Sequence, residues 1–189
     1  MNAIVADNWI LRHRITVDEY YRMAEVGLLT PDARTELIEG EVIDMAPIGD
    51  KPANTVDRLV RLFAKALADD TGLGVQRPIR LSTKSEPQPD LVIYKERNVA
   101  AGHPTGADIL LVIEVSDSTL RYDREKKAPL YAQHGIPEMW LVDLNRKQLQ
   151  RLSEPRDGAY QKVETFEGGS IQPLLLSNVS IDLDKILAL

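Results

Sequence analysis

The sequence contains no cysteine, which excludes a disulfide framework, a thiolate metal site and a cysteine nucleophile. Its only histidines are His13, His103 and His134, and their spacing is not that of metal ligands. No window approaches the roughly 18 apolar residues of a membrane-spanning helix, and the N-terminus lacks a basic segment followed by a long apolar core. We therefore expect a soluble, cytoplasmic protein with no membrane partner.

Positive charge is also scarce. Lys and Arg together number 23 against 29 Asp and Glu, which gives a net charge of −6. This balance argues against a broad surface that binds polyanions non-specifically. It does not exclude nucleic acid, because a cleft that holds divalent cations must itself be acidic and the bound ions reverse the local field.

The chain has 189 residues, of which 43% are hydrophobic, enough for one sizeable core. We expect an N-terminal arm over residues 1–15 and a single domain over residues 16–189. Thr16 and Glu19 have the spacing of a capping box and predict a short helix that ends near Gly27. Two short strands should follow, joined by a tight turn at Glu39-Gly40. Further strands are expected at 75–81, 90–94, 109–115, 138–143, 148–152 and 160–166, and helices at 56–67, 123–134 and 182–188.

The strand expected from Ile109 begins as an unbroken apolar run, which is typical of a strand buried on both faces. Glu114 interrupts this run. Desolvating a carboxylate costs several kcal/mol unless a cation or hydrogen-bond donors receive it. The sequence therefore requires a partner for Glu114.

Asp90 is the first candidate, since it opens one strand while Glu114 comes near the end of the next. If the two strands are antiparallel neighbours, their carboxylates meet. A hard divalent cation such as Mg²⁺ or Mn²⁺ would relieve both the repulsion and the desolvation, and the main-chain carbonyl of Val115 could complete its ligands.

The strand–helix–strand order from Ile109 to Asp143 predicts a right-handed crossover and therefore parallel strands at its two ends. The helix of that crossover would direct Lys127 toward Glu114. A metal beside a lysine suits phosphodiester hydrolysis, because the metal activates water and neutralises charge on the phosphate.

Pro89-Asp90, Glu114 and Lys127 resemble the Pro-Asp and Asp/Glu-x-Lys pattern of restriction-endonuclease-like nucleases, in the variant whose lysine lies on the following helix. An ordered series of blocks more closely resembles the bacterial Uma-two family of endonucleases. The blocks are 36–41, 45–47, 86–91, 112–116, 123–127 and 131–143.

The resemblance implies an α/β fold, namely a restriction-endonuclease-like mixed sheet flanked by helices. It also implies Glu39, Asp90 and Glu114 around Mg²⁺ or Mn²⁺, with Lys127 as the catalytic lysine and DNA as substrate. Cutting two strands with one site per chain would favour a homodimer.

Several alternatives remain open. Glu41 could be the ligand in place of Glu39. The fold could have lost catalysis and serve as a nucleic-acid or protein interaction module, consistent with Pro52 where many relatives carry histidine. Glu114 could instead belong to a structural cluster, with Arg121, Arg124 or Lys126 as its cation.

Overall fold

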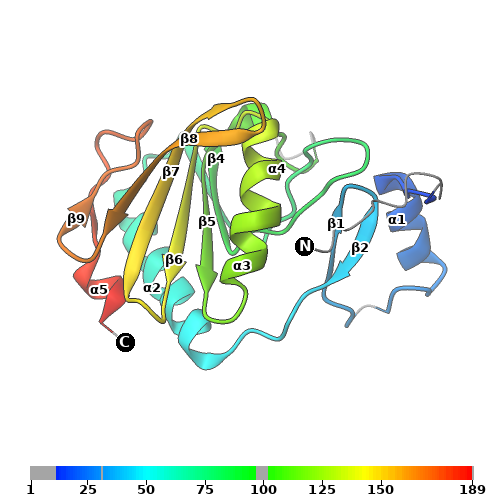
Figure 1. Cartoon of the computed structure of the whole chain (residues 1–189), viewed down its shortest axis with the longest axis horizontal. Helices are drawn as coiled ribbons and strands as arrows, with labels where there is room; N and C mark the ends of the chain where they lie inside the picture. Colours follow the sequence, from blue (N-terminus) through cyan, green and yellow to red (C-terminus); the bar gives the residue numbers. More distant parts are fainter. Residues whose placement is uncertain (1–11, 31, 97–101, 189) are drawn as a thin grey trace, which may run out of the picture.

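The computed structural model describes residues 12–30, 32–96 and 102–188, and its centre is a six-stranded sheet (Figure 1). The strands are, in spatial order, β3 (Thr71–Val75), β4 (Leu91–Lys95), β5 (Ile109–Ser116), β6 (Glu138–Asp143), β7 (Gln148–Arg156) and β8 (Ala159–Phe166). β5 and β6 run parallel, and the other neighbouring pairs are antiparallel. The expected mixed α/β class, the antiparallel β4–β5 pair and the parallel β5–β6 pair are all confirmed.

Helices cover both faces of the sheet. α2 (Asp50–Ala66) and α5 (Asp184–Leu187) pack on one face, and α4 (Ala128–Gln133) packs on the other. Successive side chains of a strand point to opposite faces. Ile113 and Val115 of β5 therefore join the α2 cluster, whereas Val112 joins the α4 cluster. The same alternation directs Glu114 toward α4, where it meets Tyr131.

The connection from β5 to β6 is one helix in three parts: α3 (Leu120–Tyr122), a π-helical turn η3 (Asp123–Lys127) and α4. Its start lies before the expected Asp123. Pro129 is accommodated in the first turn of α4, directly after the π turn. A proline ring inside a regular α-helix collides with the carbonyl four residues earlier, and the wider π turn relieves that collision.

The N-terminal part forms a separate small unit beside the sheet (Figure 1). α1 (Val17–Glu25) begins at Thr16 with the expected capping box. The hairpin of β1 (Thr35–Ile38) and β2 (Glu41–Asp44) turns at Glu39 and Gly40, which both have positive φ. An antiparallel bridge from Leu37 to Glu86 ties this hairpin to the segment before β4. Residues 1–11, most of the expected arm, lie outside the described residues.

The C-terminal part follows the prediction, with β7 and β8 each longer than expected and α5 shorter. A small hairpin of β9 (Ser170–Ile171) and β10 (Ile181–Asp182) lies between β8 and α5, and a 3-10 turn η2 (Gly106–Asp108) precedes β5. In the parts of the chain that the structure describes, no helix has both the length and the apolar character needed to cross a bilayer.

The strand expected at 75–81 was wrong, because β3 occupies Thr71–Val75 and the chain leaves the sheet at Gln76, which has a positive φ. Gly72 and Gly74 lie within the strand. Gly72 is paired with Tyr94 of β4, and a Cβ there would stand 2.4 Å from the tyrosine ring. The glycine is thus required by a close approach and not by a turn.

Gly72→Ala should destabilise the fold by about 1–3 kcal/mol, because the added methyl group overpacks the contact with Tyr94. Urea unfolding measures the loss. The double variant Gly72→Ala/Tyr94→Leu should lose less than the sum of its single variants, since the leucine removes the ring that the methyl meets. Strict additivity would contradict this explanation.

Candidate active site

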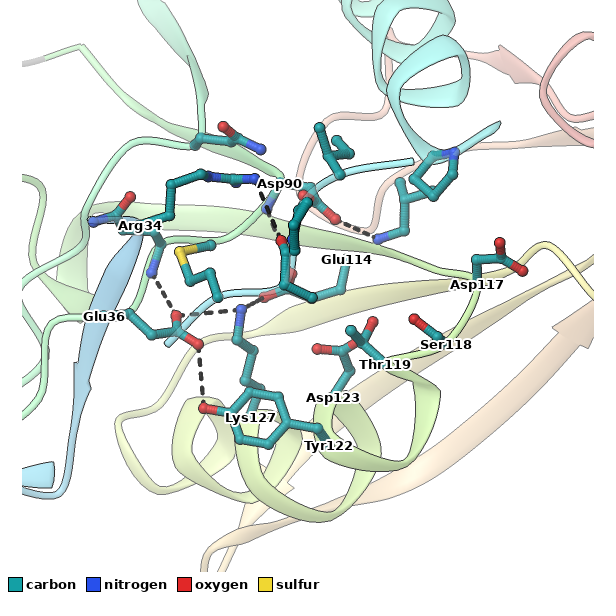
Figure 2. A pocket seen from close by; sticks show the side chains of 18 of the residues that line it. Arg34, Glu36, Asp90, Glu114, Asp117, Ser118, Thr119, Tyr122, Asp123 and Lys127 are labelled. Atoms are coloured by element: carbon teal, nitrogen blue, oxygen red, sulfur yellow. Dashed lines mark hydrogen bonds and ion pairs between the residues drawn. The ribbon is translucent and has the colours of Figure 1, made fainter. Parts of the chain in front are cut away.

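A cavity of about 370 Å³ lies where the β1–β2 hairpin unit meets the end of β5 and the start of β4. Figure 2 shows the side chains that line it, including Glu36, Asp90, Glu114, Asp123 and Lys127. The residues that line it are 34, 36, 43–49, 52, 76, 88, 90, 114, 115, 117–119, 122, 123 and 127. The cavity therefore brings together Asp90, Glu114 and Lys127, three of the residues that the sequence predicts for the site.

Asp90 and Glu114 meet as the antiparallel pairing requires. The register places Leu91 opposite Ile113, so that Asp90 lies beside Glu114 and Val115. A carboxylate oxygen of Asp90 accepts the N–H of Val115 at 2.8 Å, and the N–H of Asp90 points to Glu114 Oε2 at 3.4 Å. Burial raises the pKa of both carboxyl groups, although the Val115 N–H for Asp90 and the Lys127 cation for Glu114 act in the opposite direction.

Lys127 supplies the cation that Glu114 requires. Its Nζ lies 3.1 Å from Glu114 Oε1 and 3.3 Å from Glu36 Oε2, with only 5% of its side chain exposed. Burial alone would lower the pKa of Lys127, but the carboxylates of Glu114 and Glu36 outweigh burial and raise it. Lys127 therefore stays charged at neutral pH.

The other basic residues considered for Glu114 lie elsewhere. Arg121 pairs with Glu125 at 3.0 Å, and Arg124 donates to Gln150 at 2.8 Å. The second donor to Glu114 is Tyr131, whose hydroxyl reaches Oε1 at 2.7 Å. Burial and the nearby carboxylates raise the pKa of this tyrosine, so it remains a neutral donor.

Glu36 is the site residue that sequence reasoning missed. It is 2% exposed on β1, and its carboxylate accepts the N–H of Gln88 at 3.0 Å and the hydroxyl of Tyr122 at 3.1 Å in addition to the contact with Lys127. The available signal was the one that singled out Glu114, namely a carboxylate next to apolar strand residues. Leu37 and Ile38 follow Glu36 directly, but the strand is too short for the signal to stand out.

Glu39, expected beside the metal, does not line the cavity. It is exposed at the hairpin turn, where its N–H bonds to the hydroxyl of Ser85. Glu41, the alternative, is exposed as well and pairs with Arg14. The physical reason is the length of the hairpin: its open end borders the cavity, and the turn lies four residues away at the opposite end.

A buried carboxylate holds the loop after β5 by hydrogen bonds. Asp123 is buried and accepts the hydroxyls of Ser116 at 2.6 Å and Thr119 at 2.8 Å. The Ser116 hydroxyl thus donates to the Asp123 carboxylate and not to a histidine, which leaves it without the base that a serine nucleophile needs. Asp143, beyond the cavity, accepts the N–H of Arg146 and closes a turn.

The donor set suits a hard divalent cation. Asp90, Glu114 and the carbonyl of Val115 offer oxygen ligands, the type that Mg²⁺ and Mn²⁺ take. Four carboxylates, those of Glu36, Asp90, Glu114 and Asp123, surround one ammonium group, so the cavity has an excess of negative charge. Among the described residues, however, no three acidic or histidine side chains lie close enough together to hold a metal ion as they stand. Figure 2 shows the reason, since Lys127 extends between Glu36 and Glu114.

Comparisons with known proteins agree with this architecture. A family model described as "Uma2: Putative restriction endonuclease" matches residues 17–184. A solved structure from Anabaena variabilis ATCC 29413, titled as a putative nuclease belonging to DUF820, superposes with a TM-score of 0.72 at 15% sequence identity. The match covers 92% of this chain and 98% of that one. At that identity the likeness shows a shared fold, and no curated protein matches the chain.

Proposed function

The chain belongs to the Uma2 family, and from this premise we propose that it is a Mg²⁺-dependent endonuclease that hydrolyses phosphodiester bonds of DNA. The observation that carries the proposal is the meeting of Asp90, Glu114 and the charged Lys127 in one cavity at the end of the sheet. A homodimer would provide one site for each strand of a duplex.

The ion, held by Asp90, Glu114 and the Val115 carbonyl, would supply an activated water and neutralise charge on the phosphate. The side chains of the chain itself do the rest. Lys127 offers a fixed positive charge to a phosphate oxygen, in a buried setting where such a charge acts strongly. Tyr131 and Lys127 hold Glu114 by its Oε1, and the Val115 N–H holds Asp90, so both carboxylates keep their direction.

Purified protein should nick supercoiled plasmid DNA in the presence of Mg²⁺ or Mn²⁺ and lose this activity in excess EDTA. Gel electrophoresis of the plasmid forms measures the conversion. Restoration of nicking by added Mn²⁺ is the control for damage by the chelator. Protein that shows no conversion with either ion would contradict the proposal.

A second candidate function is supported by the position of Lys127. Because its Nζ lies between Glu36 and Glu114, the carboxylates are already neutralised in part, as in a structural cluster. Pro52, which borders the cavity, adds no ligand. These features favour an interaction module without catalysis. That module would bind no Mn²⁺ in calorimetry, whereas the nuclease would bind it through Asp90 and Glu114.

We propose that Glu36, in place of Glu39, is the third acidic residue of the site. Glu36→Gln should lower the cleavage rate by about 10- to 100-fold, because it removes one of the two carboxylates that hold Lys127. Initial rates of plasmid nicking measure the effect. The exposed Glu39→Gln serves as the matched control and should cleave as well as wild type. Equal losses in the two variants would overturn this assignment.

A further inference from the structure

The cavity of the candidate site has an apolar lining as well as an acidic one. The segment that joins β2 to α2, visible as the extended connection in Figure 1, borders it with non-polar residues, and one residue of β2 and one of α2 add to them. These residues are Ile43, Met45, Ala46, Pro47, Ile48 and Pro52. We call them the apolar wall.

The apolar wall is not part of the hydrophobic core. None of its members appears in the two clusters of buried residues that α2 and α4 form with the sheet. Ile48 is 39% exposed, and Ala46 and Pro47 are exposed beside it, whereas Ile43 and Met45 are half-buried and Pro52 is buried. Solvent-facing apolar side chains that gather at a cavity with charged groups are typical of a surface that meets a ligand.

Polar contacts hold one end of the wall. Arg34 donates to the carbonyl of Ala46 at 3.4 Å, and the N–H of Met45 bonds to the carbonyl of Arg34 at 2.7 Å. On the other side α2 begins directly after Gly49. The end of the wall at Met45 and Ala46 is therefore tied to Arg34, just before β1.

The size of the cavity limits what can reach the carboxylates. About 370 Å³ lies in the lower part of the range for small-molecule pockets. A phosphate that reaches Asp90, Glu114 and Lys127 must bring its own sugar and base against the remaining lining. In a paired duplex the base is stacked and its face is not available for such a contact.

From these observations, and resting on the proposed function, we propose that the substrate presents an unpaired nucleotide next to the scissile phosphate. The apolar wall then packs against the base and sugar of single-stranded DNA, or of a single-stranded segment within a duplex. Contact with a base face tolerates any sequence, because every base has such a face. The side-chain amide of Gln88, which also lines the cavity, donates to the carbonyl of Thr35.

The proposal is tested with three DNA substrates of one sequence: a single strand, a full duplex, and a duplex with a central unpaired segment. The single strand and the interrupted duplex should be cleaved with a kcat/KM at least about tenfold above that of the full duplex. A fourth substrate, a strand in which every base is replaced by an abasic tetrahydrofuran unit, measures what the base contributes. Wild type should cleave it about tenfold less efficiently than the normal strand.

The variant Met45→Ser/Ile48→Ser removes two apolar side chains from the wall. It should cleave the normal strand about tenfold less efficiently than wild type and should not distinguish the normal strand from the abasic one. Leu175→Ser, at a leucine that is 57% exposed and does not line the cavity, is the matched control and should behave as wild type. Its activity also shows that loss of an exposed apolar side chain does not itself impair folding.

The outcomes separate the two proposals. Equal cleavage of single strand and duplex, with no effect of Met45→Ser/Ile48→Ser, overturns the unpaired-nucleotide proposal and leaves the nuclease proposal standing. No cleavage of any substrate by wild type with Mn²⁺ overturns both. A variant that still prefers the normal strand to the abasic one as strongly as wild type shows that the base is not held by the apolar wall.

Discussion

Glu114→Gln should abolish Mn²⁺ binding and reduce DNA cleavage by more than about a hundredfold. The substitution keeps the shape of the side chain but removes the charge that lies between Asp90 and Lys127. Changes to groups that only support a metal ligand typically cost 10- to 100-fold, so removal of a charged ligand should exceed that range. Calorimetric titration with Mn²⁺ and initial rates of plasmid nicking measure the two effects.

The control for Glu114→Gln is another buried carboxylate on the neighbouring strand. Glu138 of β6 accepts the indole N–H of Trp140 and the N–H of Leu174, both at 2.6 Å, and it does not line the cavity. Glu138→Gln should cost stability, because one of these donors would face an amide nitrogen. It should nevertheless bind Mn²⁺ as wild type does. Loss of binding in both variants would indicate a general effect of unfolding, and full activity of Glu114→Gln would contradict the proposed metal site.

The sequence permits the site to be predicted where strand pairing determines it. The apolar run around Glu114 and the short connection from Asp90 leave one arrangement, in which antiparallel pairing brings the two carboxylates together. Lys127 follows from the crossover, since the helix must pack back on the sheet. These inferences depend on contacts between strands that are adjacent in the chain.

The third acidic residue could not be placed in that way. Glu36 and Glu39 lie on a hairpin that pairs with itself and meets the sheet only through loops, so no register within the main sheet fixes which of them enters the cavity. The position of β3 was missed for a related reason. Gly72 and Gly74 have the composition of a turn, and only the neighbouring Tyr94 and Val92 explain why a strand needs glycine there.

The sequence also did not predict the π turn. Within η3 both Asp123 and Lys127 are buried toward the cavity, while the three residues between them are exposed. Side chains four positions apart share a face in a regular α-helix as well, so the π turn is not needed to bring these two residues together. Pro129 indicated an irregularity at this point of the helix without specifying its kind.

Lys127→Met should destabilise the protein by about 3–5 kcal/mol and abolish cleavage, because it leaves the buried Glu36 and Glu114 without their cation. Methionine retains most of the volume and the apolar stem of lysine, so the loss of stability measures the effect of removing the positive charge. Urea unfolding measures the stability. Lys126→Met, at the exposed neighbour on the same turn, is the control and should stay within about 0.5 kcal/mol of wild type.

The loss in Lys127→Met should depend on pH in a defined direction. Burial raises the pKa of Glu114 above its ordinary value of 4.5, and Lys127 counteracts that increase, so its removal raises the pKa of Glu114 further. A carboxyl group with a raised pKa in the folded state binds more protons there than in the unfolded chain. Stability then falls as the pH rises from about 4.5 through the folded-state pKa. Lys127→Met should therefore lose less stability relative to wild type at pH 5.5 than at pH 8. If the loss is the same at both pH values, Glu114 does not take up a proton when its cation is removed.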